Sequence, residues 1–91
     1  MTGYKELAKV FSEIENEKDM ECFLKEILTE SELDAVVFRW RLMEDLYRGE
    51  TQRNIAEKHG ISLCKITRGS KILKDEKSIS LKLLKRMERI K

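Results

Sequence analysis

The segment from Ser31 to Arg48 has apolar side chains around more than half of a helical circumference, and this pattern limits the possible folds most strongly. Its apolar residues are Leu33, Val36, Val37, Trp40, Leu42, Met43, Leu46 and Tyr47. Such a helix needs packing partners on several sides, and a chain of 91 residues has few segments to supply them. We therefore expect a second copy of the chain to cover part of it. The alternative is that the other helices of the same chain cover it.

The rest of the chain also follows helical spacing. Apolar residues recur at steps of three and four over residues 4–14, 20–28 and 81–90, and no proline interrupts them. We expect a break at Asn16–Asp19, a helix that begins at Ser31 and ends at Gly49, and a last helix capped by Ser80. The sequence thus predicts an all-α fold of five to six helices in a single domain, residues 1–91.

Composition excludes several classes of protein. Two cysteines make no disulfide framework, and with the one histidine they have no zinc-site spacing. There is no apolar run of membrane length, no signal-peptide block, no nucleophile triad and no phosphate loop. We expect the acidic pairs Glu44–Asp45 and Asp75–Glu76 to be solvated. The chain is therefore predicted to be a cytoplasmic binding module, without enzymatic activity, metal or membrane partner.

The net charge of +2 hides a strong asymmetry. Residues 1–50 carry 7 basic against 13 acidic side chains, whereas residues 51–74 carry 6 basic side chains and one acidic, Glu57. An acidic body with a basic block indicates one face suited to a polyanion. The alternative is an ordinary solvated helix surface.

The basic block has the pattern of a helix-turn-helix, over about residues 51–73. Thr51 can cap a first helix, and Ile55 and Ala56 then point inward. Gly60 supplies the left-handed residue of a tight turn, and Ile61 anchors that turn to the core. A second helix follows the cap Ser62, with candidate core residues Leu63, Ile66 and Leu73. The alternative is a helical hairpin without a nucleic-acid partner.

Other side chains of this block are candidate contacts to double-stranded operator DNA. Gln52 and Arg53 begin the first helix, where they can meet phosphates or a guanine edge. The second helix would enter the groove with its exposed start, which includes Leu63, Cys64, Lys65 and Thr67. Lys65 can donate to guanine, while Cys64 and Thr67 can contact thymine methyl groups. The expected phosphate contacts are Ser70, Lys71 and Lys74.

Four segments carry a more specific pattern: Leu28–Thr29, RWRLMEDLYRGE at 39–50, TQRNIAEKHGIS at 51–62, and ITRGS at 66–70 followed by Leu73–Lys74. Together they resemble the Trp repressor family of bacterial tryptophan operons. The resemblance implies an all-helical, entwined homodimer. Its two helix-turn-helix heads would read operator half-sites in successive major grooves.

The resemblance also implies a small-molecule effector, L-tryptophan, as corepressor between Arg39 and Arg68. The Leu28 backbone, Thr29 and Gly69 would line the same site. Two guanidinium planes can sandwich an indole, and one of them can pair with the ligand carboxylate. A ligand there would hold the recognition helix at the angle that the groove requires. The alternatives are a surface ion pair for Arg39 and a phosphate contact for Arg68.

Two positions depart from the family pattern: Ile72 stands where the family has a serine near the ligand, and Lys65 where it often has a small residue or threonine. Our main hypothesis is a sequence-specific DNA-binding transcriptional repressor of tryptophan metabolism genes, with L-tryptophan as corepressor. One alternative is a related helix-turn-helix regulator with a different ligand or none. Another is a helical protein-interaction module whose basic face meets an acidic protein.

Overall fold

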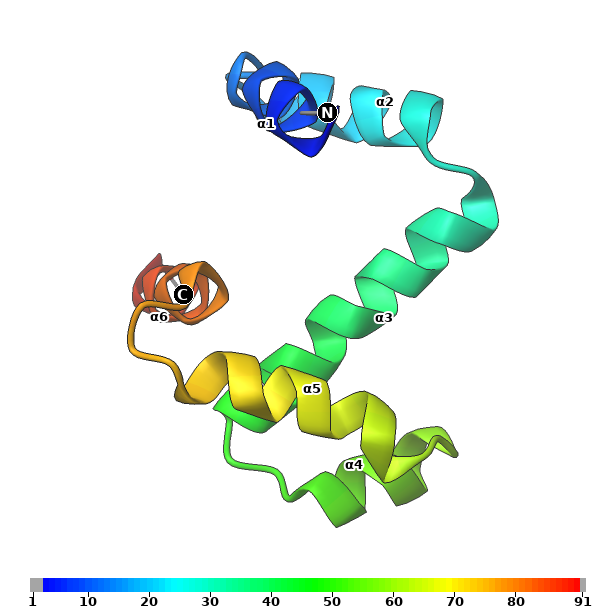
Figure 1. Ribbon diagram of the computed structural model, residues 1–91, viewed down its shortest axis with the longest axis vertical. Coiled ribbons are helices and arrows are strands. Elements are labelled where there is room, and N and C mark those ends of the chain that lie inside the picture. The colour runs from blue at the N-terminus through cyan, green and yellow to red at the C-terminus, as the bar shows by residue number, and fades with distance from the viewer. Residues whose placement is uncertain (1–2, 91) are drawn as a thin grey trace. The chain divides into compact units, whose positions relative to one another are not determined.

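The computed structural model describes residues 3–90, with side chains described up to Glu88. Within this range the only regular elements are six helices (Figure 1): α1 (Gly3–Ser12), α2 (Glu17–Ile27), α3 (Glu30–Tyr47), α4 (Gln52–His59), α5 (Leu63–Lys74) and α6 (Ile79–Ile90). The predicted all-α fold of five to six helices is therefore confirmed. Residues 1, 2 and 91 of the predicted single domain lie outside the described residues. None of the described helices is long and apolar enough to cross a membrane.

The chain divides between Ala35 and Val36 into two compact units. In the first unit, α1 and α2 are joined by a short connection that ends at Asn16. The Asn16 side-chain oxygen accepts a hydrogen bond from the Asp19 backbone N–H at 2.8 Å, which makes Asn16 the N-cap of α2. A break is present, but it lies earlier than the predicted Asn16–Asp19: it spans residues 13–16, and Glu17–Asp19 already belong to the first turn of α2. The Phe11 and Phe23 rings pack edge to face, with centroids 5.2 Å apart.

The start of α3 is set by a reciprocal pair of hydrogen bonds. The Thr29 N–H donates to Glu32 Oε1 at 2.9 Å, and the Glu32 N–H donates to Thr29 Oγ1 at 3.1 Å. This is a capping box, which satisfies two backbone donors that the helix itself leaves unpaired. Ser31 was therefore the wrong cap, because Thr29 has its glutamate at the required spacing of three. The hydrogen bonds from the Thr29 backbone and side chain lower the pKa of Glu32.

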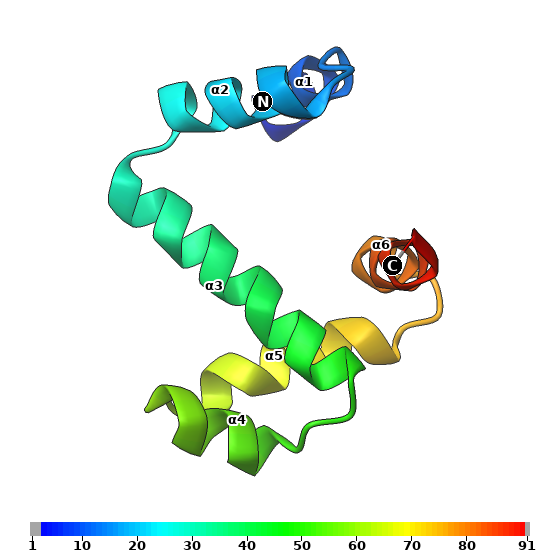
Figure 2. The ribbon, with the colours of Figure 1, turned by 180° about the vertical axis from the view of Figure 1, so that it is seen from behind.

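The second unit is built around one small core that three helices share. Leu42 from α3, Ile55 from α4 and Ile66 from α5 are buried, and the two isoleucines are completely inaccessible to solvent. Half-buried apolar side chains complete the cluster: Phe38, Leu46, Ala56 and Ile61. Because of this core, α4 and α5 lie against the C-terminal part of α3 (Figure 1, Figure 2).

The last helix follows a tight turn after α5. The Asp75 carboxylate accepts from the Lys77 N–H at 2.9 Å, and the Ser78 hydroxyl oxygen accepts from the Leu81 N–H at 3.1 Å. Ser78 therefore caps α6, and the prediction of Ser80 is wrong because the Asp75 turn starts the helix two residues earlier. Leu84 is buried on this helix. The pair Asp75–Glu76 is exposed, as predicted.

Candidate nucleic-acid interface and effector site

Local chemistry sets both ends of α4. The Thr51 hydroxyl accepts from the Asn54 N–H at 3.1 Å, so Thr51 is the predicted N-cap. Gly60 ends the helix in the left-handed conformation, with φ +64° and ψ 39°. The Ile61 N–H then donates back to the Ala56 carbonyl at 3.1 Å, while its side chain packs on the core. These features confirm the predicted sequence of helix, tight turn and helix.

The helix α5 buries one side and exposes the other. Ile66 is fully buried, whereas the exposed predicted DNA contacts on this helix are Leu63, Cys64, Lys65, Lys71 and Lys74. Arg68, a predicted effector residue, is also exposed. Leu63 is 49% exposed, so its prediction as a core residue is wrong; the first turn of α5 reaches past the core that Ile66 fills. The steps of three between Lys65, Arg68, Lys71 and Lys74 place these cations along one broad stripe. We call these four residues the basic stripe.

Two other predicted DNA contacts lie between α4 and α5. The Thr67 hydroxyl oxygen is 2.9 Å from the Leu63 carbonyl oxygen and 3.2 Å from Gln52 Oε1. The side chains of Thr67 and Gln52 are half-buried, and they connect the two helices at the edge of the basic stripe. Ser70 is also half-buried, and Arg53 is exposed in the first turn of α4. These contacts hold the first turn of α4 close to the middle of α5.

The predicted effector residues of the second unit flank the crossing of α3 and α5. A Cβ atom on Gly69 would lie 3.3 Å from Leu46 Cδ1 and 3.7 Å from Met43 Cγ, so the glycine lets α5 approach α3 closely. Arg39 lies one helical turn before Met43 on α3, and Arg68 directly precedes Gly69. Both arginines are exposed, and neither takes part in an ion pair among the described residues.

The remaining two predicted effector residues belong to the first unit. Leu28 is half-buried at the end of α2, where its N–H donates to the Leu24 carbonyl at 3.0 Å. Thr29 is exposed, and its hydroxyl oxygen accepts the capping hydrogen bond from Glu32. The Thr29 side chain also hydrogen-bonds the Glu32 carboxylate, so the capping box engages this hydroxyl as both acceptor and donor.

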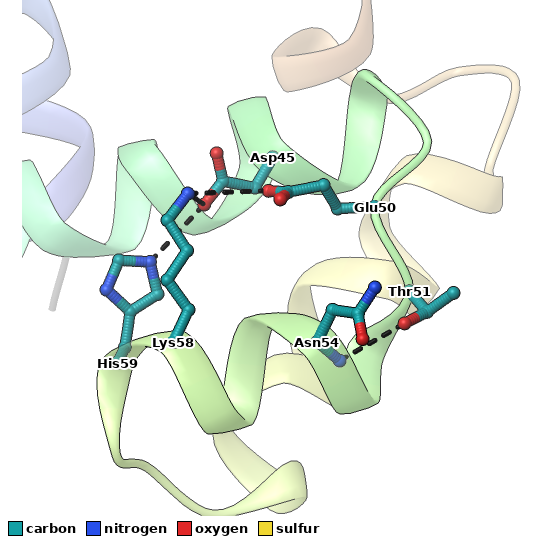
Figure 3. A network of polar contacts seen from close by, with 6 residues as sticks. All are labelled: Asp45, Glu50, Thr51, Asn54, Lys58 and His59. Carbon is teal, nitrogen blue, oxygen red and sulfur yellow. Dashed lines mark hydrogen bonds and ion pairs between the residues drawn. The ribbon is translucent and has the colours of Figure 1, made fainter.

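A polar network around Asp45 is the feature that the sequence analysis missed. Asp45 is only 8% exposed, which contradicts the prediction of a solvated Glu44–Asp45 pair. Its Oδ2 lies 3.3 Å from His59 Nε2 and 3.7 Å from Lys58 Nζ, and Lys58 Nζ is also 3.7 Å from Glu50 Oε2 (Figure 3). The spacing could have revealed it, because Asp45 follows Phe38 and Leu42 at steps of four and three and therefore faces the core.

The part of the chain that the structure describes contains no group of side chains arranged to hold a metal ion. No cluster of three or more histidine, cysteine, aspartate or glutamate side chains occurs there. Cys22 and Cys64 are both free and exposed. The candidate site is therefore made of the exposed face of α5, the start of α4 and the two arginines.

Comparisons with known proteins agree on one family. A family model described as Trp repressor protein matches residues 2–88. A Trp operon repressor homolog from Chlamydia trachomatis serovar D is 38% identical over 74 residues, which cover 80% of this chain and 79% of that protein. A Trp operon repressor homolog from Xylella fastidiosa strain M23 is 36% identical over 74 residues, covering 80% of each chain.

A Trp operon repressor homolog from Chlamydia caviae is 33% identical over 73 residues, covering 79% of this chain and 72% of that protein. No solved structure shows a significant match. The match of the family model extends over nearly the whole sequence. This chain therefore belongs to the Trp repressor family and is a Trp-repressor-like regulator.

Proposed function

We propose that this protein is a cytoplasmic, dimeric and sequence-specific DNA-binding repressor of tryptophan metabolism genes, with L-tryptophan as its corepressor. The observation that carries the proposal is the geometry of α4, the Gly60 turn and α5. It presents a helix whose exposed face is basic and whose opposite face is held to the core by Ile66. This is the form in which a recognition helix enters a major groove.

Within this proposal, the residues of the interface divide by role. Lys65, Cys64 and Leu63 lie exposed at the start of α5 and contact base edges. Lys71, Lys74 and Ser70 lie further along the helix and bind phosphates, which set the register on the duplex. Gln52 and Arg53 bind the phosphate backbone from the first turn of α4, and Thr67 contacts a thymine methyl group beside Gln52.

The proposed corepressor site is supported by the crossing of α3 and α5. Arg39 and Arg68 flank the contact of Gly69 with Met43, and both guanidinium groups are exposed and without ion-pair partners among the described residues. The indole ring of L-tryptophan would make cation–π contacts between the two arginines. The carboxylate of the ligand would accept a bidentate hydrogen bond from one guanidinium group. Thr29, Gly69 and the Leu28 backbone complete the proposed site.

The proposed second copy of the chain is supported by apolar surface. No residue of α1 or α2 is buried, and Tyr4 is 75% exposed. On α3, Val36 and Val37 are also largely exposed, although they belong to the broad apolar surface of that helix. A homodimer would cover these side chains and would match a palindromic operator with its own two-fold symmetry.

A selection of DNA fragments with the purified protein, with and without L-tryptophan, tests the proposal. We expect a few palindromic sites to be retained only with L-tryptophan, and Lys65→Ala to lose them. Lys18→Ala is the matched control, because it removes an exposed lysine from α2 and should retain the same sites. Equal retention without L-tryptophan would contradict the corepressor, and no specific retention in either condition would refute the DNA-binding function.

A further inference from the structure

The single histidine of the chain lies in the last turn of α4, directly before the Gly60 turn. Its ring contacts α3 at two points. His59 Nε2 is 3.3 Å from Asp45 Oδ2, and the His59 ring packs edge to face against Phe38, with centroids 5.2 Å apart. Phe38 and Asp45 are two helical turns apart on one face of α3, so the imidazole joins the end of α4 to that face. Figure 3 shows the contact of the ring with Asp45.

Asp45 carries a largely buried carboxylate with few charged partners nearby. The Asp45 side chain is only 12% exposed, so its carboxylate needs compensation from neighbouring groups. Lys58 supplies part of it at 3.7 Å, but its amine is shared with Glu50 and its side chain is 53% exposed. On α3, Arg41 lies one turn before Asp45 and is exposed. The helix α5 carries no acidic residue, and its Lys65 and Arg68 are exposed.

We propose that Asp45 and His59 are positioning residues, which hold the end of α4 and the start of α5 on α3 and so set the orientation of the recognition helix. This inference rests on the proposed DNA-binding function. Neither residue needs to touch DNA. The contact sets the position in space from which residues 60–66 leave α4, because His59 is the last residue of α4 before the turn.

Protonation of the imidazole strengthens this contact. A neutral ring offers Asp45 one ordinary hydrogen bond, whereas an imidazolium offers a charge-assisted hydrogen bond to a largely desolvated carboxylate. Histidine is the one side chain that ordinarily changes charge between about pH 6 and 7.5, and the chain has a single one. Operator affinity should therefore be higher at the lower end of this range, whereas binding to unrelated DNA depends on phosphate contacts and should change less.

The test measures dissociation constants for a selected operator and for an unrelated duplex at about pH 6 and 7.5, at constant ionic strength. The variants are Asp45→Asn and His59→Gln, which keep hydrogen-bonding side chains of similar size. Glu57→Gln is the matched control, because it removes an exposed acid from the same helix. We expect the parent and Glu57→Gln to bind the operator at least about fivefold more tightly at the lower pH.

In Asp45→Asn and His59→Gln, the operator affinity should be nearly the same at both pH values. Circular dichroism confirms that each variant is folded, and backbone amide NMR signals of residues 60–66 report the turn without DNA. These signals should move with pH in the parent but not in Asp45→Asn.

A pH response that persists in Asp45→Asn would overturn the proposal, because it would come from direct attraction between the imidazolium and DNA. Equal operator affinity at both pH values in the parent would also overturn it. If the parent bound no duplex while the turn signals still followed pH through Asp45, the positioning contact would stand and the proposed function would fail.

Discussion

The buried isoleucine of α4 provides a direct test of the three-helix core. Ile55 is completely inaccessible to solvent and packs in the cluster with Leu42 and Ile66. Replacing it with alanine removes three carbon atoms, worth about 0.8 kcal/mol each in transfer free energy, or about 2.4 kcal/mol. The cavity that remains adds to this loss, so we expect Ile55→Ala to lower the free energy of unfolding by about 3 kcal/mol.

Urea denaturation followed by circular dichroism measures this effect. Ile55→Val, which removes one carbon, should cost about 1 kcal/mol and keeps the prediction testable if the alanine variant does not fold. Leu63→Ala is the matched control: it also removes three carbons, but from a side chain that is 49% exposed, so it should cost well under half as much as Ile55→Ala. All variants must be compared at one protein concentration, because association would stabilise the folded state.

Equal losses for Ile55→Ala and Leu63→Ala would contradict the three-helix core, since the two costs are expected to differ only because the two side chains differ in burial. A loss below about 1 kcal/mol for Ile55→Ala would do the same, because complete closure of the cavity would still leave the lost transfer free energy of a buried side chain.

Four further predictions follow from particular residues. Gly60→Ala should lower the free energy of unfolding by about 1 kcal/mol in urea denaturation, because φ is +64° and no atom obstructs the added Cβ; no loss would contradict the left-handed turn. The Thr29 hydrogen bonds lower the pKa of Glu32, so the stability that they contribute is present above the ordinary glutamate pKa and is lost as pH falls through the lowered value. The free energy of unfolding, measured over pH 3–6, should therefore depend less on pH in Glu32→Gln than in the parent. Lys71→Ala should reduce the slope of log binding constant against log salt by about one unit, whereas Lys18→Ala should leave it unchanged. Arg68→Leu should abolish L-tryptophan binding in calorimetry while DNA affinity without ligand falls only slightly; unchanged ligand affinity would exclude the proposed arginine sandwich.

Local sequence was sufficient wherever neighbouring residues alone determine the backbone. Thr51 caps α4 and Gly60 turns the chain as predicted, because each acts through atoms within a few residues. Caps were misassigned where two hydroxyl residues compete within one turn. Thr29 rather than Ser31 caps α3, since only Thr29 has its glutamate three positions later, and the same competition favours Ser78 over Ser80.

Some features of the candidate site can likewise be predicted from the sequence, and others cannot. The basic stripe and its helical spacing are readable from the sequence, and so is the resemblance that proposes Arg39 and Arg68 as effector residues. That Gly69 packs on Leu46 and Met43 is a fact of the crossing between α3 and α5. No pattern along α5 alone could show it, because the partner residues lie more than twenty positions earlier in the chain.

The helices, the tight turn and the charge of the exposed face can be predicted from the sequence, since these depend on residues within one or two helical turns of one another. The exposure of Leu63 and the burial of Asp45 beside His59 follow instead from the packing of α3, α4 and α5. The reason is that burial depends on which segments pack together. A short aspartate that looks solvated in its own helix can be enclosed by a histidine fourteen residues away.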